Sequence, residues 1–84
     1  MSRPGAADLD QEVLEAAADV FRVSAGAVSS ASGPRDIPRW DSFGHLEFVL
    51  ELEVRFSIKL STAEILQVKR LADAQRLVRA KLAQ

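Results

Sequence analysis

The residues with the clearest chemical potential are Asp41 and Ser42, which stand where a polar stretch changes into an apolar helical one. Both residue types cap helices, because a short side-chain oxygen can accept a hydrogen bond from the free N–H groups of the first turn. A serine hydroxyl placed there is exposed and faces the positive end of the helix dipole, a setting that favours a bound phosphate. Ser42 is therefore the candidate for phosphate chemistry, with Asp41 as the cap beside it.

A different chemistry would pair Ser42 with His45, which lies one helical turn further along on the same side. A serine and a histidine so placed could act as a nucleophile and its base in a small hydrolase. No third orienting residue and no set of oxyanion donors is evident, and a chain of this length has little room for a deep pocket. We therefore expect His45 to be a surface residue beside Ser42, and the hydrolase is kept as an alternative.

The composition narrows the classes of function further. The 84 residues suit one small domain, and a hydrophobic fraction of 48% supplies a core. The absence of cysteine excludes disulfides, thiolate metal sites and a cysteine nucleophile, and a single histidine argues against a zinc or iron site. A net charge of −1 gives no basic footprint for nucleic acid. The apolar runs are too short for a bilayer, and no run of the signal-peptide type is present, so we expect a cytoplasmic protein.

The first helix is expected to begin at Asp8, because Asp8 and Gln11 have the spacing of a capping box. Apolar residues recur from there at three- and four-residue steps until about Val23. Residues 1–7 are small, polar and interrupted by proline and glycine, so they are expected to form a flexible N-terminal tail. The domain proper would then span residues 8–84.

A long loop follows over residues 24–40, where Ser, Ala, Gly and Pro dominate. Loops of this length are uncommon in compact domains and are usually functional or disordered, and the residues alone leave both readings open. We expect Val28 and Ile37 to attach this loop to the core, and Trp40 to plug the edge of the core.

The second helix is predicted over residues 42–56 and is apolar on more than one side, so it should contact other helices on more than one side. Gly44 lowers its helix propensity, and the missing side chain either leaves room for a partner or is incidental. A separate polar face is either solvated, with one ion pair, or a docking strip. The apolar residues are Phe43, Leu46, Leu50 and Val54 on one stripe, with Val49, Leu52 and Phe56 beside it; the polar ones are Glu47, Glu51 and Arg55.

The last part of the chain predicts a short crossing, a short helix and a longer one. Ile58 and Leu60 should be buried anchors of the crossing, which spans residues 57–61. Ser61 and Glu64 have capping-box spacing, so a third helix is expected over residues 62–67, with Ile65 and Leu66 turned toward the core. The fourth helix is expected over residues 70–82. The prediction is an all-α, small four-helix bundle, with three main helices, one short helix and a long first loop.

A longer pattern around Ser42 resembles the acyl and peptidyl carrier proteins, whose second helix begins with Asp-Ser-Leu and continues with apolar and acidic residues at similar spacings. The resemblance covers roughly residues 8–82 and includes the long first loop and the short third helix. The residues that carry it are Asp41-Ser42-Phe43, Leu46-Glu47, Leu52-Glu53, Phe56, Ile58 and Leu60.

The resemblance implies that Ser42 is modified with 4′-phosphopantetheine, which coenzyme A donates, and that Asp41 belongs to the motif. The thiol of this arm would carry acyl or aminoacyl groups as thioesters, and the protein itself would catalyse nothing. The implied partners are a phosphopantetheinyl transferase, an acyl- or aminoacyl-loading enzyme and downstream synthase enzymes of a polyketide, nonribosomal peptide or fatty-acid-type pathway. We expect a stand-alone monomer that binds no metal, nucleic acid or membrane.

The chain also departs from the family pattern. Phe43 stands where the family usually has leucine, and its ring is expected to fill the pocket under the helix start. Val54 and Arg55 replace residues that are often acidic, while Glu47, Glu51 and Glu53 remain. Phe43, Glu47 and Glu51 are therefore the predicted partner-docking residues. The departures also support an alternative, a helical interaction module that keeps the carrier fold without the modification.

Overall fold

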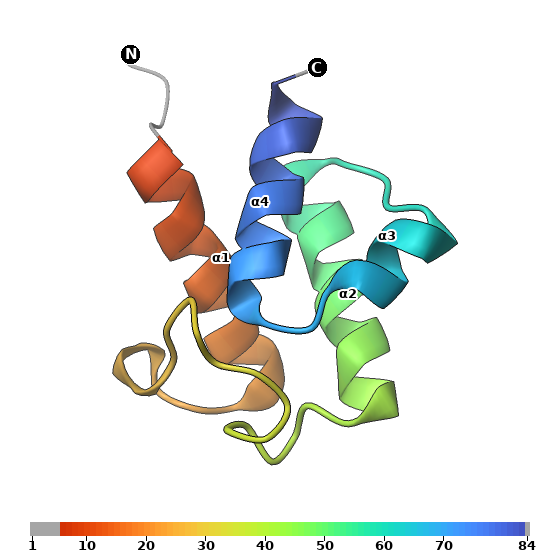
Figure 1. Cartoon of the computed structure of the whole chain (residues 1–84). Coiled ribbons are helices and arrows are strands. Elements are labelled where there is room, and N and C mark those ends of the chain that lie inside the picture. The colour runs from red at the N-terminus through yellow and green to blue at the C-terminus, as the bar shows by residue number, and fades with distance from the viewer. Residues whose placement is uncertain (1–5, 84) are drawn as a thin grey trace.

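The computed structural model describes residues 6–83 and places four α-helices in them (Figure 1). No strand occurs in this part of the chain. The predicted all-α fold, with three main helices, one short helix and a long first loop, is confirmed. In these residues each helix is also too short or too polar to cross a membrane. The elements are α1 (Ala6–Phe21), the 3-10 turn η1 (Ala25–Ala27), α2 (Ser42–Phe56), α3 (Thr62–Gln67) and α4 (Leu71–Leu82).

The bounds of α2 and α3 are those predicted, but α1 begins and ends earlier. It starts at Ala6, so Asp8 lies in its first turn and is not its cap. It ends at Phe21 because Arg22 adopts a left-handed conformation, with φ of 57°, and the Val23 N–H donates to the Ala18 carbonyl at 3.1 Å. This is the 6→1 hydrogen bond of a Schellman motif, which ends the helix. Of the predicted tail, residues 1–5 lie outside the described residues.

The core forms where α1 packs against α2 and α4, with α1 beginning and α4 ending at one end of the bundle (Figure 1). The alanines at the centre of α1 let the neighbouring helices approach closely. Ile58 and Leu60 anchor the 57–61 crossing, as predicted. The buried residues of the three main helices are Val13, Ala16, Ala17 and Phe21 of α1, Phe48, Val49, Leu52 and Phe56 of α2, and Leu71, Ala74 and Val78 of α4.

Helix α2 contacts α1 and α4 through the core and α3 through His45, so it meets other helices on more than one side, but its second apolar stripe is not what makes these contacts. Its inner face carries Phe48, Val49, Leu52 and Phe56 into the core. The other apolar stripe faces away, because α3 is only six residues long and leaves it uncovered. The exposed fractions are 71% for Phe43, 54% for Leu46, 60% for Leu50 and 79% for Val54.

The long loop is ordered by its contacts and not merely a connector. Val28 and Ile37 are buried, as expected. Its backbone also reaches the start of α4, where the Leu71 N–H donates to the Ser32 carbonyl at 3.0 Å and the Ala72 N–H donates to the Ser30 carbonyl at 2.8 Å. Since the first N–H groups of a helix have no acceptor within the helix, these loop carbonyls satisfy two of them.

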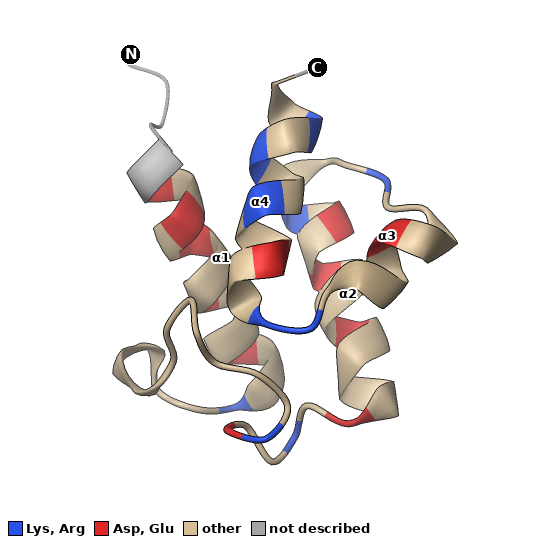
Figure 2. Ribbon diagram, viewed as in Figure 1, with Lys and Arg blue, Asp and Glu red and all other residues tan. Residues whose placement is uncertain are grey.

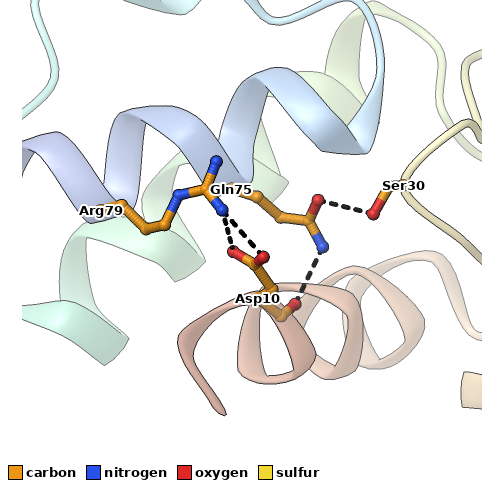
Figure 3. A network of polar contacts seen from close by, with 4 residues as sticks. All are labelled: Asp10, Ser30, Gln75 and Arg79. Atoms are coloured by element: carbon orange, nitrogen blue, oxygen red, sulfur yellow. Dashed lines mark hydrogen bonds and ion pairs between the residues drawn. The ribbon is translucent and has the colours of Figure 1, made fainter. Parts of the chain in front are cut away.

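A polar network fixes α4 to α1 and to the loop (Figure 3). Gln75 of α4 is only 4% exposed, and its amide donates to the Asp10 carbonyl of α1 at 3.1 Å. Its amide oxygen accepts from the Ser30 hydroxyl at 2.7 Å. Arg79 donates to the Asp10 carboxylate at 2.9 Å. The buried amide therefore has partners for both of its polar atoms, as a buried polar group requires.

Candidate functional site

The start of α2 has the geometry predicted from the sequence. Asp41 is the N-cap with extended backbone, φ −100° and ψ −168°, and its carboxylate accepts from the Gly44 N–H at 2.7 Å. The His45 N–H donates to the Asp41 carbonyl at 2.8 Å and closes the first turn. Ser42 is the first residue of the helix and is exposed. The N–H groups of Ser42 and Phe43 have no acceptor within the helix, so they remain available to an anion at this end.

The structure explains why residue 44 is a glycine, which the sequence did not reveal. It is buried, and a Cβ atom at this position would lie 2.0 Å from the Arg39 carbonyl oxygen. The backbone just before Asp41 therefore crosses the first turn of α2 too closely for any side chain there. Neither expectation for Gly44, room for a partner or chance, describes this role.

Trp40 holds the residue before Asp41 in place. It is 3% exposed, as expected of a plug at the core edge. Its ring stacks on Phe21 of α1 with centroids 5.1 Å apart, and it meets Phe48 of α2 edge-on at 5.8 Å. Because Trp40 is fixed by two helices, the position of Ser42, two residues later, is fixed relative to the core.

The expectation that His45 is a surface residue is wrong. Its ring is partly buried and parallel to Trp40, with an interplanar angle of 13°. The Trp40 indole N–H donates to His45 Nδ1 at 2.9 Å, and His45 Nε2 lies 2.9 Å from the Ile65 carbonyl oxygen of α3. Both ring nitrogens are thus engaged away from Ser42. This arrangement does not offer His45 as the base that a serine hydrolase would need.

Two open grooves flank the start of α2. The first, which we call the apolar groove, has a volume of about 620 Å³ and runs between α2 and α3. The second, the polar groove, has a volume of about 570 Å³ and runs between α1 and α2. Ser42 lines only the apolar groove, together with Pro34, Trp40, Asp41, His45, Leu46, Ile65, Leu66 and Val68.

An exposed apolar surface continues from Ser42 along α2. We call it the apolar ridge; it consists of Phe43, Leu46, Leu50 and Val54 of α2 and Leu66 of α3. Phe43 does not fill a pocket under the helix start, and Leu66 does not turn toward the core, while Ile65 does pack against the core. Large apolar side chains exposed at this helical spacing make the ridge a candidate interaction surface. The available signal was that α2 is apolar on two sides while α3 is too short to cover one of them.

The acidic residues beside the ridge differ in their surroundings. Figure 2 shows acidic positions along the length of α2. Glu47 is exposed and makes no ion pair within residues 6–83, whereas Glu51 is half-buried and pairs with Arg55 at 2.9 Å. Arg55 also reaches Asp19 of α1 at 2.9 Å. Partial burial lowers the pKa of Arg55, but its hydrogen bonds to Asp19 and Glu51 outweigh this and raise the pKa above its ordinary value. Arg55 is thus part of the α1–α2 contact.

The structure brings the predicted site residues together on one helix. Asp41 caps α2, and Ser42, Phe43, Glu47 and Glu51 lie on its first three turns; all but Ser42 border the polar groove. Within the described residues, no three His, Cys, Asp or Glu side chains converge in a way that could hold a metal ion. The chain matches no model of a known protein family and no curated protein with which it was compared.

Proposed function

We propose that this protein is an acyl or aminoacyl carrier, with 4′-phosphopantetheine from coenzyme A attached to Ser42. The observation that supports it most is the exposed Ser42 hydroxyl at the first residue of α2, fixed by Asp41 on one side and by Trp40 behind it. Ser42 therefore presents its oxygen to an approaching enzyme without any rearrangement of the core. We place this role in the cytoplasm and assign it to a monomer.

The residues around Ser42 fit such a group. A phosphodiester on the Ser42 oxygen would lie near the N–H groups of Ser42 and Phe43 and the positive end of the α2 dipole. The apolar groove begins at the same serine and offers an apolar surface for an arm or for its cargo. When bound, the group supplies the thiol that carries cargo as a thioester, which this cysteine-free chain lacks.

The apolar ridge and its acidic border suit the partner enzymes that such a carrier requires. These are the phosphopantetheinyl transferase, a loading enzyme and downstream synthase enzymes of a polyketide, nonribosomal peptide or fatty-acid-type pathway. Phe43 is the ridge residue next to Ser42, and Glu47 lies one turn further along. A partner surface with an apolar centre and a basic rim would complement both, the first by burial and the second by charge.

The second candidate is a helical interaction module that binds its partner without modification. The size of the exposed ridge favours this function as much as it favours the carrier. The two functions differ in what they require of Ser42, because only the carrier needs its hydroxyl.

The deciding experiment is the intact mass of the unmodified protein after incubation with coenzyme A and a phosphopantetheinyl transferase of broad specificity. We expect a gain of one phosphopantetheinyl group, and none in Ser42→Ala. Ser24→Ala is the matched control, because Ser24 is also exposed and its side chain makes no capping bond. A wild-type mass that does not change would refute the carrier and leave the interaction module.

The same assay tests the docking residues through its rate. Phe43→Ser and the double variant Glu47→Lys, Glu51→Lys should slow the transfer by about tenfold, and added salt should slow the wild type in the same way. Glu12→Lys, an exposed charge reversal on α1, should leave the rate unchanged. Equal rates in all four proteins would remove Phe43, Glu47 and Glu51 from the docking surface.

A further inference from the structure

We infer that His45 is a positioning residue: its neutral imidazole, protonated on Nε2, clasps α3 to Trp40 and so sets the width of the apolar groove beside Ser42. We call the three groups involved, the Trp40 indole, the His45 ring and the Ile65 carbonyl, the clasp. The inference concerns the unmodified fold and goes beyond the carrier function.

The partners of His45 determine which nitrogen carries its proton. The Trp40 indole N–H can only donate, and it lies 2.9 Å from His45 Nδ1, so Nδ1 must be the acceptor. The Ile65 carbonyl can only accept, and it lies 2.9 Å from Nε2, so Nε2 must be the donor. A single neutral tautomer satisfies both bonds, whereas the doubly protonated ring would place two N–H groups against each other at Trp40.

Few other contacts hold α3 in place. None of its residues is buried, and Ile65 is its residue that packs against the core. Its capping box, between Ser61 and Glu64, is internal to the segment. The polar contacts that join α3 to other helices in the described residues are the His45–Ile65 bond and an ion pair between Glu64 and Lys81 of α4, at 3.0 Å. The His45–Ile65 bond is the one of these that joins α3 to α2, across the apolar groove.

Loss of the clasp would open the groove on one side. His45 and Trp40 line the apolar groove from the side of α2, and Ile65 and Leu66 line it from α3. If Nδ1 carried the proton, the nearly buried Trp40 indole N–H would lose the acceptor it has among the described residues, and this would penalise the closed arrangement. The closed arrangement therefore requires the tautomer with its proton on Nε2.

The charged groups around the clasp are few. Among the residues that line the apolar groove, Asp41 is the ionisable one besides His45, and its carboxylate is bound by the Gly44 N–H. On α3, Glu64 is bound by Lys81 and by the Ser61 N–H. Arg35 and Lys69 follow Pro34 and Val68 in sequence and border a neighbouring groove. The clasp can therefore be tested through His45 alone.

The chain makes this test unusually direct, since His45 is its one histidine, Trp40 its one tryptophan, and it has no tyrosine. Three signals are followed in the unmodified protein at pH 8: the His45 ring nitrogen resonances, Trp40 fluorescence, and amide-exchange protection factors of α3. We expect the ring resonances to place the proton on Nε2, and both other signals to change when the two bonds of His45 are removed. A proton on Nδ1 would overturn the clasp.

Two variants separate the two hydrogen bonds from simple packing. His45→Phe removes both bonds but keeps a ring, so α3 protection should fall about fivefold while that of α1 and α4 stays constant. His45→Gln has one acceptor and one donor, so it should keep α3 protected. A phenylalanine variant with full protection, or a glutamine variant with the low protection expected of the phenylalanine variant, would overturn the inference. Neither result bears on whether Ser42 is modified.

Discussion

The two apolar faces of α2 are similar in composition, but one is buried in the core and the other is exposed. The inner face, centred on Phe48, contacts the aromatic rings of Phe21 and Trp40 and is closed by α1 and α4. The outer face, the apolar ridge, begins beside Ser42 and has only the short α3 near it. The difference shows that hydrophobicity alone does not choose which side of a helix becomes core; the length and position of the neighbouring helices do.

The division also separates stability from the proposed function. The inner face and the α1–α4 network provide a fixed support for the start of α2 (Figure 3). The outer side of α2 leaves Phe43 of the ridge exposed, together with the neighbouring Ser42 and Glu47. Substitutions of these exposed residues should therefore affect the action of partner enzymes while changing the stability of the fold little.

The largest expected effect is that of Phe48→Ala, which removes a fully buried ring at the meeting point of α1, α2 and Trp40. We expect it to lower the free energy of unfolding by about 3–5 kcal/mol. Leu50→Ala, on the ridge, is the matched control and should change it by no more than about 0.5 kcal/mol. Urea unfolding followed by circular dichroism measures both; similar losses for the two variants would contradict the assignment of the faces.

The next effect concerns Gly44, which lies on the inner side of the first turn. Helix propensity predicts that Gly44→Ala stabilises α2 by about 1 kcal/mol. The Arg39 carbonyl oxygen, 2.0 Å from the new Cβ, predicts the opposite, a loss of about 1–3 kcal/mol. Gly26→Ala provides the control, because a Cβ there meets nothing within 4 Å. If thermal unfolding shows a gain for Gly44→Ala, the close crossing at the start of α2 is wrong.

The smallest effect lies in a polar contact outside both faces. Burial raises the pKa of Asp73, but hydrogen bonds from the Lys69 and Arg70 N–H groups and from Arg76 outweigh it and hold the pKa below its ordinary value of 3.8. This carboxylate therefore stabilises the folded chain above that value, and its contribution is lost as the pH falls through the folded pKa.

Asp73→Asn should therefore flatten the dependence of stability on pH below about 3.8. The measurement is the urea midpoint of wild type and variant at pH values on both sides of that point. A dependence unchanged by the substitution would show that Asp73 does not stabilise the link between α3 and α4 by its charge.

The local signals of the sequence identified most of the fold. Apolar periodicity and the breakers around it gave α2, α3 and α4 close to their observed bounds, and the capping box of Ser61 and Glu64 is present as predicted. Asp41 is the cap and Ser42 the exposed first residue, because the interactions that define a helix start lie within four residues. The start of α1 was misplaced, because the helix continues two residues before Asp8.

The errors at the site involve contacts that depend on the tertiary packing. The sequence pattern could not show that Trp40 and Ile65 take both nitrogens of His45, since Ile65 lies twenty residues away. It could not show that the Arg39 carbonyl requires a glycine at position 44, because the crossing depends on where Trp40 packs between α1 and α2.

What the sequence determined by itself is the set of helices, the bounds of α2 and α3 and the serine at the start of α2, because these follow from the side chains of neighbouring residues. Only the tertiary structure decided which apolar face of α2 is buried, what engages His45 and which surfaces border Ser42. Those outcomes depend on how four short helices share a limited core, and a helix with two apolar faces can bury only the one that its neighbours cover.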